Sequence, residues 1–194
     1  LITNIVPLNN GYRCRISYMT KLPNFAFIDS QNLNLGTKSA GWKIDFRKFR
    51  LYLKNKYNVE KAYLFIGEVT GNESLYDALK EMGYHLVLKP TTEYTEDDKV
   101  TVKGNVDAEL VLYAAAKTFP YYDRAVIVSG DGDFYCLVEF LLERGKLLTV
   151  LTPNRHYSSL LKKFDKHIKR LDNAKRSLEF RTNKKAKTSG RSKP

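Results

Sequence analysis

Cysteine and histidine are scarce in this sequence of 194 residues, which contains two cysteines and three histidines. Cys14 and Cys136 lie far apart in the chain, so we expect neither a disulfide framework nor a thiolate zinc site. So few cysteines are typical of a protein in a reducing compartment, and we expect the cytoplasm. The histidines are scattered along the chain and give no support to a serine or cysteine catalytic triad.

The sequence also lacks long apolar runs and a phosphate-binding loop. No stretch approaches the roughly 18 apolar residues that a bilayer-spanning helix needs, so we expect no membrane partner. No Gly-x4-Gly-Lys-Ser/Thr motif occurs, which disfavours an ATPase. Hydrophobic residues make up 43% of the chain and aromatic residues 12%, which is enough to build a core and excludes wholesale disorder.

Positive charge is concentrated towards the C-terminus. The formal net charge is +12, and residues 154–194 hold 14 basic and 3 acidic side chains, whereas residues 1–153 are nearly neutral. This asymmetry favours contact with a polyanion, with nucleic acid ahead of an anionic membrane surface. A solubilising tail without a partner is the alternative that the charge alone leaves open.

Composition divides the chain into four parts. Residues 1–20 show no clear period and indicate an extension that is dispensable or not native, with Met19 as the natural start. Residues 21–153 form the domain, and residues 182–194 a flexible basic tail. Residues 154–181 carry apolar side chains at intervals of three, four or seven, which predicts a basic amphipathic helix that packs on the domain or on a second copy, as a homodimer. The apolar side chains of this segment are Tyr157, Leu161, Phe164, Ile168, Leu171 and Leu178.

Within the domain, short apolar runs alternate with helical patterns. A polar loop is expected through Gly36 and Gly41, a helix from near Asp45, and an exposed loop or hairpin over residues 91–99. Further helices are expected from near Asn72 and over residues 105–117 and 133–144. Strands separated by helices predict a three-layer α/β domain with a mostly parallel sheet of about five strands. The expected strands are residues 25–28, 62–66, 84–88, 125–128 and 147–151.

Four aspartates follow these strands where an open parallel sheet places its ligand site. Asp29 directly follows the first strand, Asp131 and Asp133 follow the fourth, and Asp107 lies in the first turn of the helix over residues 105–117. Each of them taken singly could serve only as a helix or loop cap. Topology nevertheless predicts that their side chains converge at one edge of the sheet.

Convergence of these carboxylates would require a compensating charge. Two carboxylates about 5 Å apart repel by roughly 3 kcal/mol at an effective dielectric of 20, whereas a helix cap returns about 1 kcal/mol. Oxygen ligands without histidine or cysteine favour Mg²⁺ or Mn²⁺ over zinc. Lys103 could contact a phosphate oxygen at this site, although a solvated loop lysine is an equal alternative.

Three motifs resemble the NYN domain of LabA-like proteins, which belongs to the PIN-like nuclease superfamily. They are Phe27-Ile-Asp-Ser-Gln-Asn-Leu33, Lys103-Gly-Asn-Val-Asp107 and Val128-Ser-Gly-Asp-Gly-Asp-Phe134, and the similarity runs over residues 24–153. The resemblance implies a Rossmann-like (PIN-like) fold and metal-dependent RNA cleavage. The positions that match the family's catalytic and metal-binding acids are Asp29, Asp107, Asp131 and Asp133, and those that match its accompanying polar residues are Asn32 and Ser129.

This sequence departs from the family pattern at Tyr113, where many relatives have a further aspartate. The resemblance still predicts a Mg²⁺- or Mn²⁺-dependent ribonuclease that acts on single-stranded RNA. The basic C-terminal segment fits this activity as a substrate tether, with Lys162, Lys163 and Lys166 holding phosphates. A non-catalytic RNA-binding or regulatory module is the alternative that Tyr113 favours. The short Asp131-Gly-Asp133 motif matches the Asp-x-Asp pattern of nucleotide-sugar transferases, which leaves such an enzyme as a third hypothesis.

Overall fold

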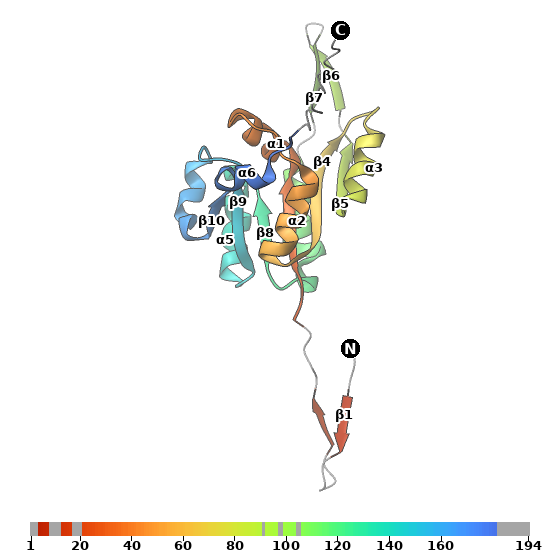
Figure 1. Ribbon diagram of the computed structural model, residues 1–194, viewed down its shortest axis with the longest axis vertical. Coiled ribbons are helices and arrows are strands. Elements are labelled where there is room, and N and C mark those ends of the chain that lie inside the picture. Colours follow the sequence, from red (N-terminus) through yellow and green to blue (C-terminus); the bar gives the residue numbers. More distant parts are fainter. Residues whose placement is uncertain are drawn as a thin grey trace, which may run out of the picture.

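The computed structural model describes residues 4–7, 13–16, 21–90, 92–96, 99–103 and 106–181, and its centre is a six-stranded parallel sheet (Figure 1). The strand order is β10-β9-β8-β3-β4-β5. All five strands expected from the apolar runs are confirmed, and β10 is a sixth that the sequence did not predict. The bounds are β3 Asn24–Asp29, β4 Val59–Glu68, β5 Tyr84–Pro90, β8 Ala125–Val128, β9 Leu147–Thr152 and β10 Ile168–Arg170.

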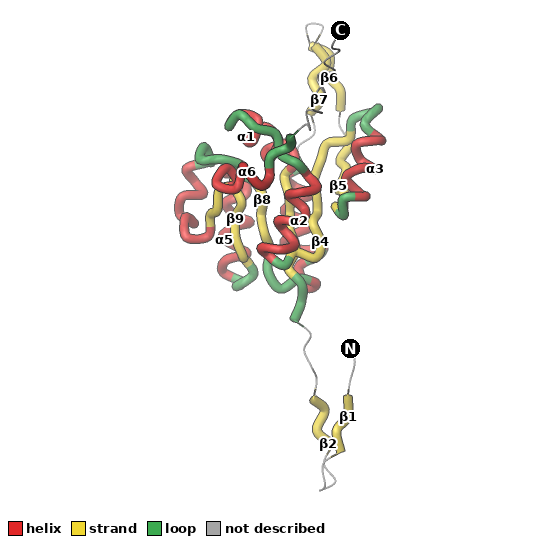
Figure 2. Tube along the Cα trace, in the orientation of Figure 1, coloured by secondary structure: helices red, strands yellow, loops and turns green. Residues whose placement is uncertain are grey.

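Helices cover both faces of this sheet, which confirms the three-layer α/β prediction (Figure 2). One face carries α1, α2, α3, the 3-10 helix η5 and α6, and the other carries α4, η1, α5 and the 3-10 helix η4. Their bounds are α1 Ser30–Ser39, α2 Phe46–Tyr57, α3 Glu73–Glu81, α4 Asp107–Leu112, the π-helical turn η1 Tyr113–Lys117, α5 Tyr135–Glu143, η4 Ser159–His167, η5 Leu171–Ala174 and α6 Lys175–Leu178. Two further 3-10 turns are η2 Phe119–Tyr121 and η3 Gly132–Phe134.

Two antiparallel strand pairs complete the described structure. β1 (Asn4–Pro7) pairs with β2 (Arg13–Ile16), and β6 (Thr92–Glu96) pairs with β7 (Lys99–Lys103), as the hairpin alternative expected. Whether residues 1–20 are dispensable stays a prediction, and the tail over residues 182–194 lies outside the described residues. None of the described helices is long and apolar enough to cross a membrane.

The polar loop expected after the first strand is wrong, because that stretch forms α1. Asp29 caps this helix: its side chain accepts a hydrogen bond from the amide of Asn32. Leu33 is the buried apolar residue of this helix, and the hydroxyl of Thr37 donates a hydrogen bond to the carbonyl of Leu33 at 2.9 Å. A methyl group on Gly36 would lie 2.5 Å from Cβ of Pro153, so only glycine allows α1 to approach the end of β9 this closely.

The single basic helix expected over residues 154–181 is also wrong, because the segment forms η4, β10, η5 and α6 in succession. Phe164 has a non-helical backbone, and the β-branched Ile168 begins a strand that pairs with β9 opposite Val150. Pairing with the edge strand β9 gives the backbone of residues 168–170 hydrogen-bond partners. This tertiary interaction outweighs the helical spacing of the apolar residues, which is only a weak preference for helix. The apolar side chains are nevertheless buried against the domain itself, and a homodimer stays a prediction.

Candidate active site

Asp29 is the last residue of β3, and the residue is 5% exposed. One carboxylate oxygen, Oδ1, accepts the amide of Asn32 at 3.0 Å, in the first turn of α1. The other, Oδ2, accepts the hydroxyl of Ser129 at 3.2 Å, from the end of β8. Since β3 and β8 are neighbouring parallel strands, with Ile28 opposite Val128, their carboxyl ends bring the first and third sequence motifs together.

The loop after β8 is held in place by the same groups. The amide of Gly130 donates to Oδ1 of Asn32 at 2.8 Å, and the amide of Asp131 donates to the hydroxyl oxygen of Ser129 at 3.1 Å. Asp131 then caps η3 by accepting the amide of Asp133 at 3.1 Å. Asn32 and Ser129 therefore position this loop directly, in addition to any contact that they make with a ligand.

The electrostatic environment of Asp29 is unfavourable to its charge. Burial raises the pKa of this carboxyl, and the negative charges of Asp107 and Asp131 raise it further, whereas the hydrogen bonds from Asn32 and Ser129 partly oppose the shift. Asp107 begins α4, which packs against β3 and η3. This packing places the charge of Asp107 at the same edge of the sheet. The charges of Asp107 and Asp131, two of the other three expected aspartates, thus both act on Asp29.

Asp133 has a different position. Its side chain is exposed, and it is absent from the groups that perturb the pKa of Asp29. Its backbone amide donates to the capping carboxylate of Asp131, a contact that does not depend on the Asp133 side chain. The structure therefore brings Asp133 to the rim of the site and not beside the buried carboxylate of Asp29.

A divalent ion fits the donor chemistry of this site. Among the described residues, no three histidine, cysteine or acidic side chains converge on a single point. Mg²⁺ nevertheless keeps several water ligands and is usually bound by one or two carboxylates together with substrate phosphates. Asp29 and Asp131 supply two carboxylates of that kind, and the Ser129 hydroxyl joins the carboxylate of Asp29 to the backbone amide of Asp131.

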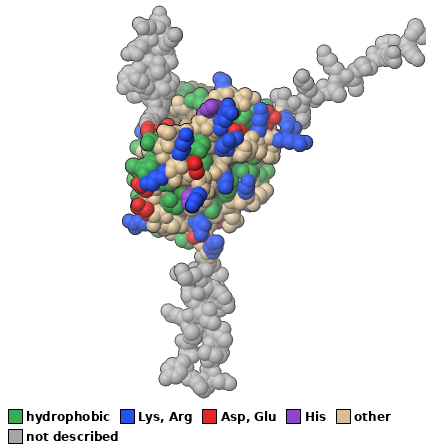
Figure 3. Space-filling view, turned by 90° about the vertical axis from the view of Figure 1, so that its left-hand side faces the viewer, with side chains coloured by type: hydrophobic (Ala, Val, Ile, Leu, Met, Phe, Trp, Pro, Cys, Tyr) green, Lys and Arg blue, Asp and Glu red, His purple; other side chains and the backbone are tan. Residues whose placement is uncertain are grey.

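The lysines expected to bind substrate fall into three groups. Lys103 ends β7, and its side chain lies outside the described structure. Lys162 and Lys166 are exposed on η4. The face of the molecule drawn in Figure 3 shows more lysine and arginine than acidic side chains. Lys163 is engaged, because its ammonium donates to Glu139 at 2.7 Å and to the hydroxyl of Tyr135 at 2.8 Å.

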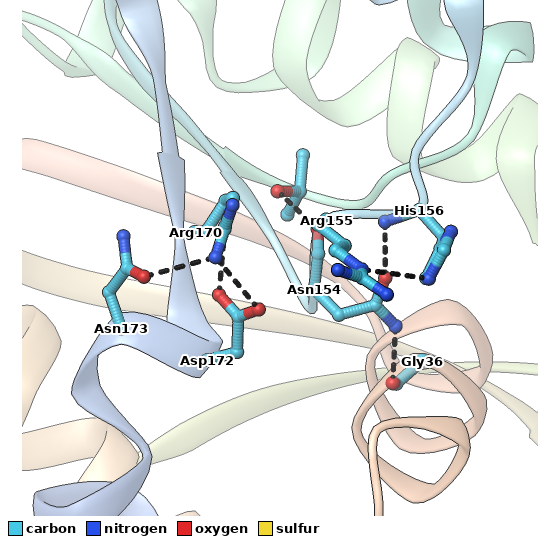
Figure 4. A network of polar contacts seen from close by, with 8 residues as sticks. Gly36, Asn154, Arg155, His156, Arg170, Asp172 and Asn173 are labelled. Carbon is cyan, nitrogen blue, oxygen red and sulfur yellow. Dashed lines mark hydrogen bonds and ion pairs between the residues drawn. The ribbon is translucent and has the colours of Figure 1, made fainter.

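Several polar residues at this edge of the sheet were missed by the sequence reasoning. The buried Asn154 follows β9 and joins it to α1 by donating to the Gly36 carbonyl at 2.6 Å, while its oxygen accepts the amide of His156 (Figure 4). Lys89, at the end of β5, pairs with Glu109 of α4 at 3.1 Å. A signal was available, since Lys89 directly follows the apolar residues of β5 as Asp29 follows those of β3, and Asn154 lies two residues beyond the end of β9.

Tyr113 is the residue at which the sequence departs from the pattern of the family that it resembles. Its ring lies 5.6 Å from that of Tyr63 and 5.5 Å from that of Phe65, measured between centroids, and the ammonium of Lys117 lies 4.6 Å above it. Tyr113 also begins the π-helical turn that follows α4. The residue therefore contributes to packing between α4 and the sheet.

Comparison with known proteins gives three matches. The sequence matches the NYN domain over residues 25–172, a range that includes β10. It is 29% identical over 135 residues to the low amplitude and bright protein LabA of Synechococcus elongatus, which covers 66% of this chain and 72% of that protein. The crystal structure of a protein of unknown function from Vibrio parahaemolyticus superimposes with a TM-score of 0.68 at 23% identity, over 84% of this chain and all of that chain. The last match supports the fold alone.

Proposed function

The chain belongs to the NYN domain family, and from this we propose that it is a ribonuclease that hydrolyses phosphodiester bonds of single-stranded RNA with the help of Mg²⁺ or Mn²⁺. The observation that carries the proposal is the buried Asp29, which is held beside the charges of Asp107 and Asp131. A fold that only needed a helix cap could use an uncharged asparagine or serine there without this repulsion. The presence of a carboxylate at position 29 despite this repulsion indicates a function that needs its charge.

Each residue of the site has a specific role in this proposal. Asp29 and Asp131 are the groups that would hold the ion, which supplies an activated water and stabilises charge on the attacked phosphate. Ser129 fixes the orientation of the Asp29 carboxylate, and Asn32 fixes the loop that carries Asp131. Asp107 orients the attacking water or assists a second ion.

The remaining expected residues serve the substrate and the rim of the site. Asp133 is exposed and therefore able to orient water at the rim or to meet a second ion. Lys103 contacts a non-bridging phosphate oxygen, and Lys162 and Lys166 hold the RNA backbone further along η4. Contacts of this kind carry little sequence preference and weaken steeply as the salt concentration rises.

A non-catalytic RNA-binding module is the second candidate, and one observation favours it. Tyr113 occupies the position of the relatives' further aspartate and is committed to ring packing, so that carboxylate has no substitute there. Such a module would bind RNA without divalent ions and would never cut it.

Cleavage of a fluorescent single-stranded RNA distinguishes the two candidates. We expect wild-type protein to cleave it with Mn²⁺ or Mg²⁺ and not with EDTA, and we expect Asp29→Asn and Asp131→Asn each to abolish cleavage. Asp77→Asn is the matched control, because Asp77 is an exposed acid of α3 whose ion pair with Lys80 lies on the surface. Undiminished cleavage by both folded site variants would refute the ribonuclease mechanism, and RNA binding without any cleavage by the wild type would favour the module.

A further inference from the structure

A cleft of about 390 Å³ lies beside β10, at the edge of the sheet away from β5. Its volume is within the roughly 300–1,000 Å³ of clefts that hold small ligands. Tyr52 and Lys56 of α2 line one side, and Tyr157 lines it together with Lys169 and Arg170 of β10. None of these side chains belongs to the carboxylate site described above.

The cleft carries an excess of positive charge. Lys169 is exposed and forms no hydrogen bond or ion pair with any described residue, and Lys56 contacts only the rings of Tyr52 and Tyr57, at 5.2 and 5.8 Å. Arg170 is already paired with Asp172 at 3.0 Å. Asp165 also lines the cleft, so its lining holds three basic side chains and one acidic one. Two ammonium groups that pair with no acid among the described residues are suited to a phosphate.

Tyr157 adds an aromatic surface to these cations. Its hydroxyl donates to Asp165 at 3.0 Å, which fixes the direction of the side chain, and its ring stacks on no other aromatic ring of the described residues. Stacking of a base on such a ring contributes about 1–3 kcal/mol and tolerates any base. Tyr157 is half-buried against the core and also lines the cleft, and an aromatic surface beside a phosphate site matches the chemistry of a nucleotide.

Tyr157 also forms a wall between the cleft and the loop that carries Asp131. A methyl group on Gly130 would lie 3.1 Å from Cβ of Tyr157, and the amide of Ser158 donates to the Gly130 carbonyl at 2.9 Å. The backbone of Tyr157 therefore lies against the site loop, while its side chain lines the cleft.

We propose that the cleft beside β10 binds one nucleotide unit of the RNA, with its base on Tyr157 and its phosphate between Lys56 and Lys169. This inference rests on the proposed function for the identity of the strand, although the nucleotide chemistry is carried by the cleft alone. A free nucleoside monophosphate has the same chemistry, and the experiment separates it from a unit of RNA.

The test measures binding of a fluorescent 12-residue RNA to the full chain in EDTA, so that no cleavage occurs. We expect Lys169→Glu to weaken binding about tenfold and Lys54→Glu, which makes the same charge change at an exposed residue of α2 outside the cleft, to weaken it less than about twofold. Tyr157→Leu should lose affinity by about fivefold or more, whereas Tyr157→Phe should keep it because the ring remains. Circular dichroism checks that each variant is folded.

Titration with AMP, adenosine and inorganic phosphate identifies the source of the ligand. If the wild type binds AMP and Lys169→Glu does not, the cleft also takes free nucleotides. If Lys169→Glu loses RNA binding but the wild type does not bind AMP, the cleft takes only a unit of the RNA strand. Equal RNA affinities for Lys169→Glu and Lys54→Glu, or for Tyr157→Leu and Tyr157→Phe, overturn the proposal. Cleavage that persists in Asp29→Asn and Asp131→Asn would instead refute the proposed function and leave these binding results intact.

Discussion

The side-chain oxygen of Asn32 accepts a hydrogen bond from the amide of Gly130 at 2.8 Å. This bond joins the first turn of α1 to the loop after β8, across two segments that are 98 positions apart. Asp29 and Asp131, the two carboxylates that we propose as ion ligands, lie on either side of it. The separation of those carboxylates therefore depends on an uncharged residue that does not itself bind the ion.

Replacement of Asn32 by alanine tests this dependence. Asn32→Ala leaves the buried Gly130 amide without a partner, which should lower the free energy of unfolding by about 1–2 kcal/mol. RNA cleavage should fall by more than the folded fraction accounts for, because the loop with Asp131 is released. Urea unfolding and kcat/KM measure the two effects. Asn34→Ala, at an exposed position of α1, is the control, and an equal activity in both variants would contradict the positioning role.

Replacement of Asp29 by asparagine should stabilise the metal-free protein. Because the pKa of Asp29 is raised in the folded state by burial, the folded protein binds this proton more tightly than the unfolded chain does. The ionised carboxylate therefore lowers stability once the pH rises above the ordinary value of 3.8, and it lowers it fully above the raised pKa. Asparagine keeps the capping acceptor without the charge.

Thermal unfolding in EDTA measures this effect. We expect a higher Tm for Asp29→Asn than for the wild type at neutral pH, and a difference that shrinks as the pH falls towards 3.8. Mg²⁺ or Mn²⁺ should raise the Tm of the wild type and leave that of Asp29→Asn almost unchanged, because only an ion that binds the folded state stabilises it. A lower Tm for the variant in EDTA would mean that the carboxylate serves only as a cap.

The sequence predicted the parts of this fold that depend on local pattern. Apolar runs marked the central strands, and topology alone brought Asp29, Asp107 and Asp131 to one edge of the sheet. The sequence did not predict α1, because that helix buries few apolar side chains and depends on a contact between Gly36 and Pro153. Pro153 lies more than 100 residues away in the chain.

The same limit applies to the C-terminal segment and to the candidate site. β10 exists because it pairs with β9, and a helical spacing of apolar residues carries no information about that edge. Lys163 was expected to bind phosphate, but its contacts with Glu139 and Tyr135 depend on α5 packing beside η4. A one-dimensional pattern indicates which side chains are buried more reliably than which polar groups meet.

Gly132 is predicted to tolerate no side chain, because a Cβ there would lie 2.3 Å from the hydroxyl oxygen of Ser158 and 3.0 Å from its Cβ. Gly132→Ala should therefore cost about 1–3 kcal/mol of unfolding free energy, as overpacking does. Ser158→Gly alone should cost a few tenths of a kcal/mol, because glycine is an acceptable cap for η4. The double variant should recover most of the loss, and strictly additive costs in chemical denaturation would contradict the close contact.

Tyr113 offers a test of the departure from the family pattern. Tyr113→Asp removes a ring packed against Tyr63 and Phe65 and places a charge beside them, so we expect a loss of about 3 kcal/mol or more in unfolding free energy. We expect no gain in RNA cleavage. Tyr113→Phe keeps the ring and should change stability by less than about 1 kcal/mol. Faster cleavage by a folded Tyr113→Asp would show that the missing carboxylate limits activity.

Two truncations separate the structural and electrostatic roles of the C-terminal region. Removal of everything after Pro153 deletes β10 and the buried side chains Leu161, Phe164 and Leu171, so the remaining chain should show no cooperative thermal transition. Removal of residues 182–194 deletes five basic residues beyond the described domain and should leave the Tm unchanged. RNA binding by this shorter protein should weaken at low salt, with a smaller slope of log affinity against log salt concentration, because fewer counterions are released on binding. An unchanged slope would mean that these residues contact no phosphate and that the lysines of η4 and β10 account for the binding.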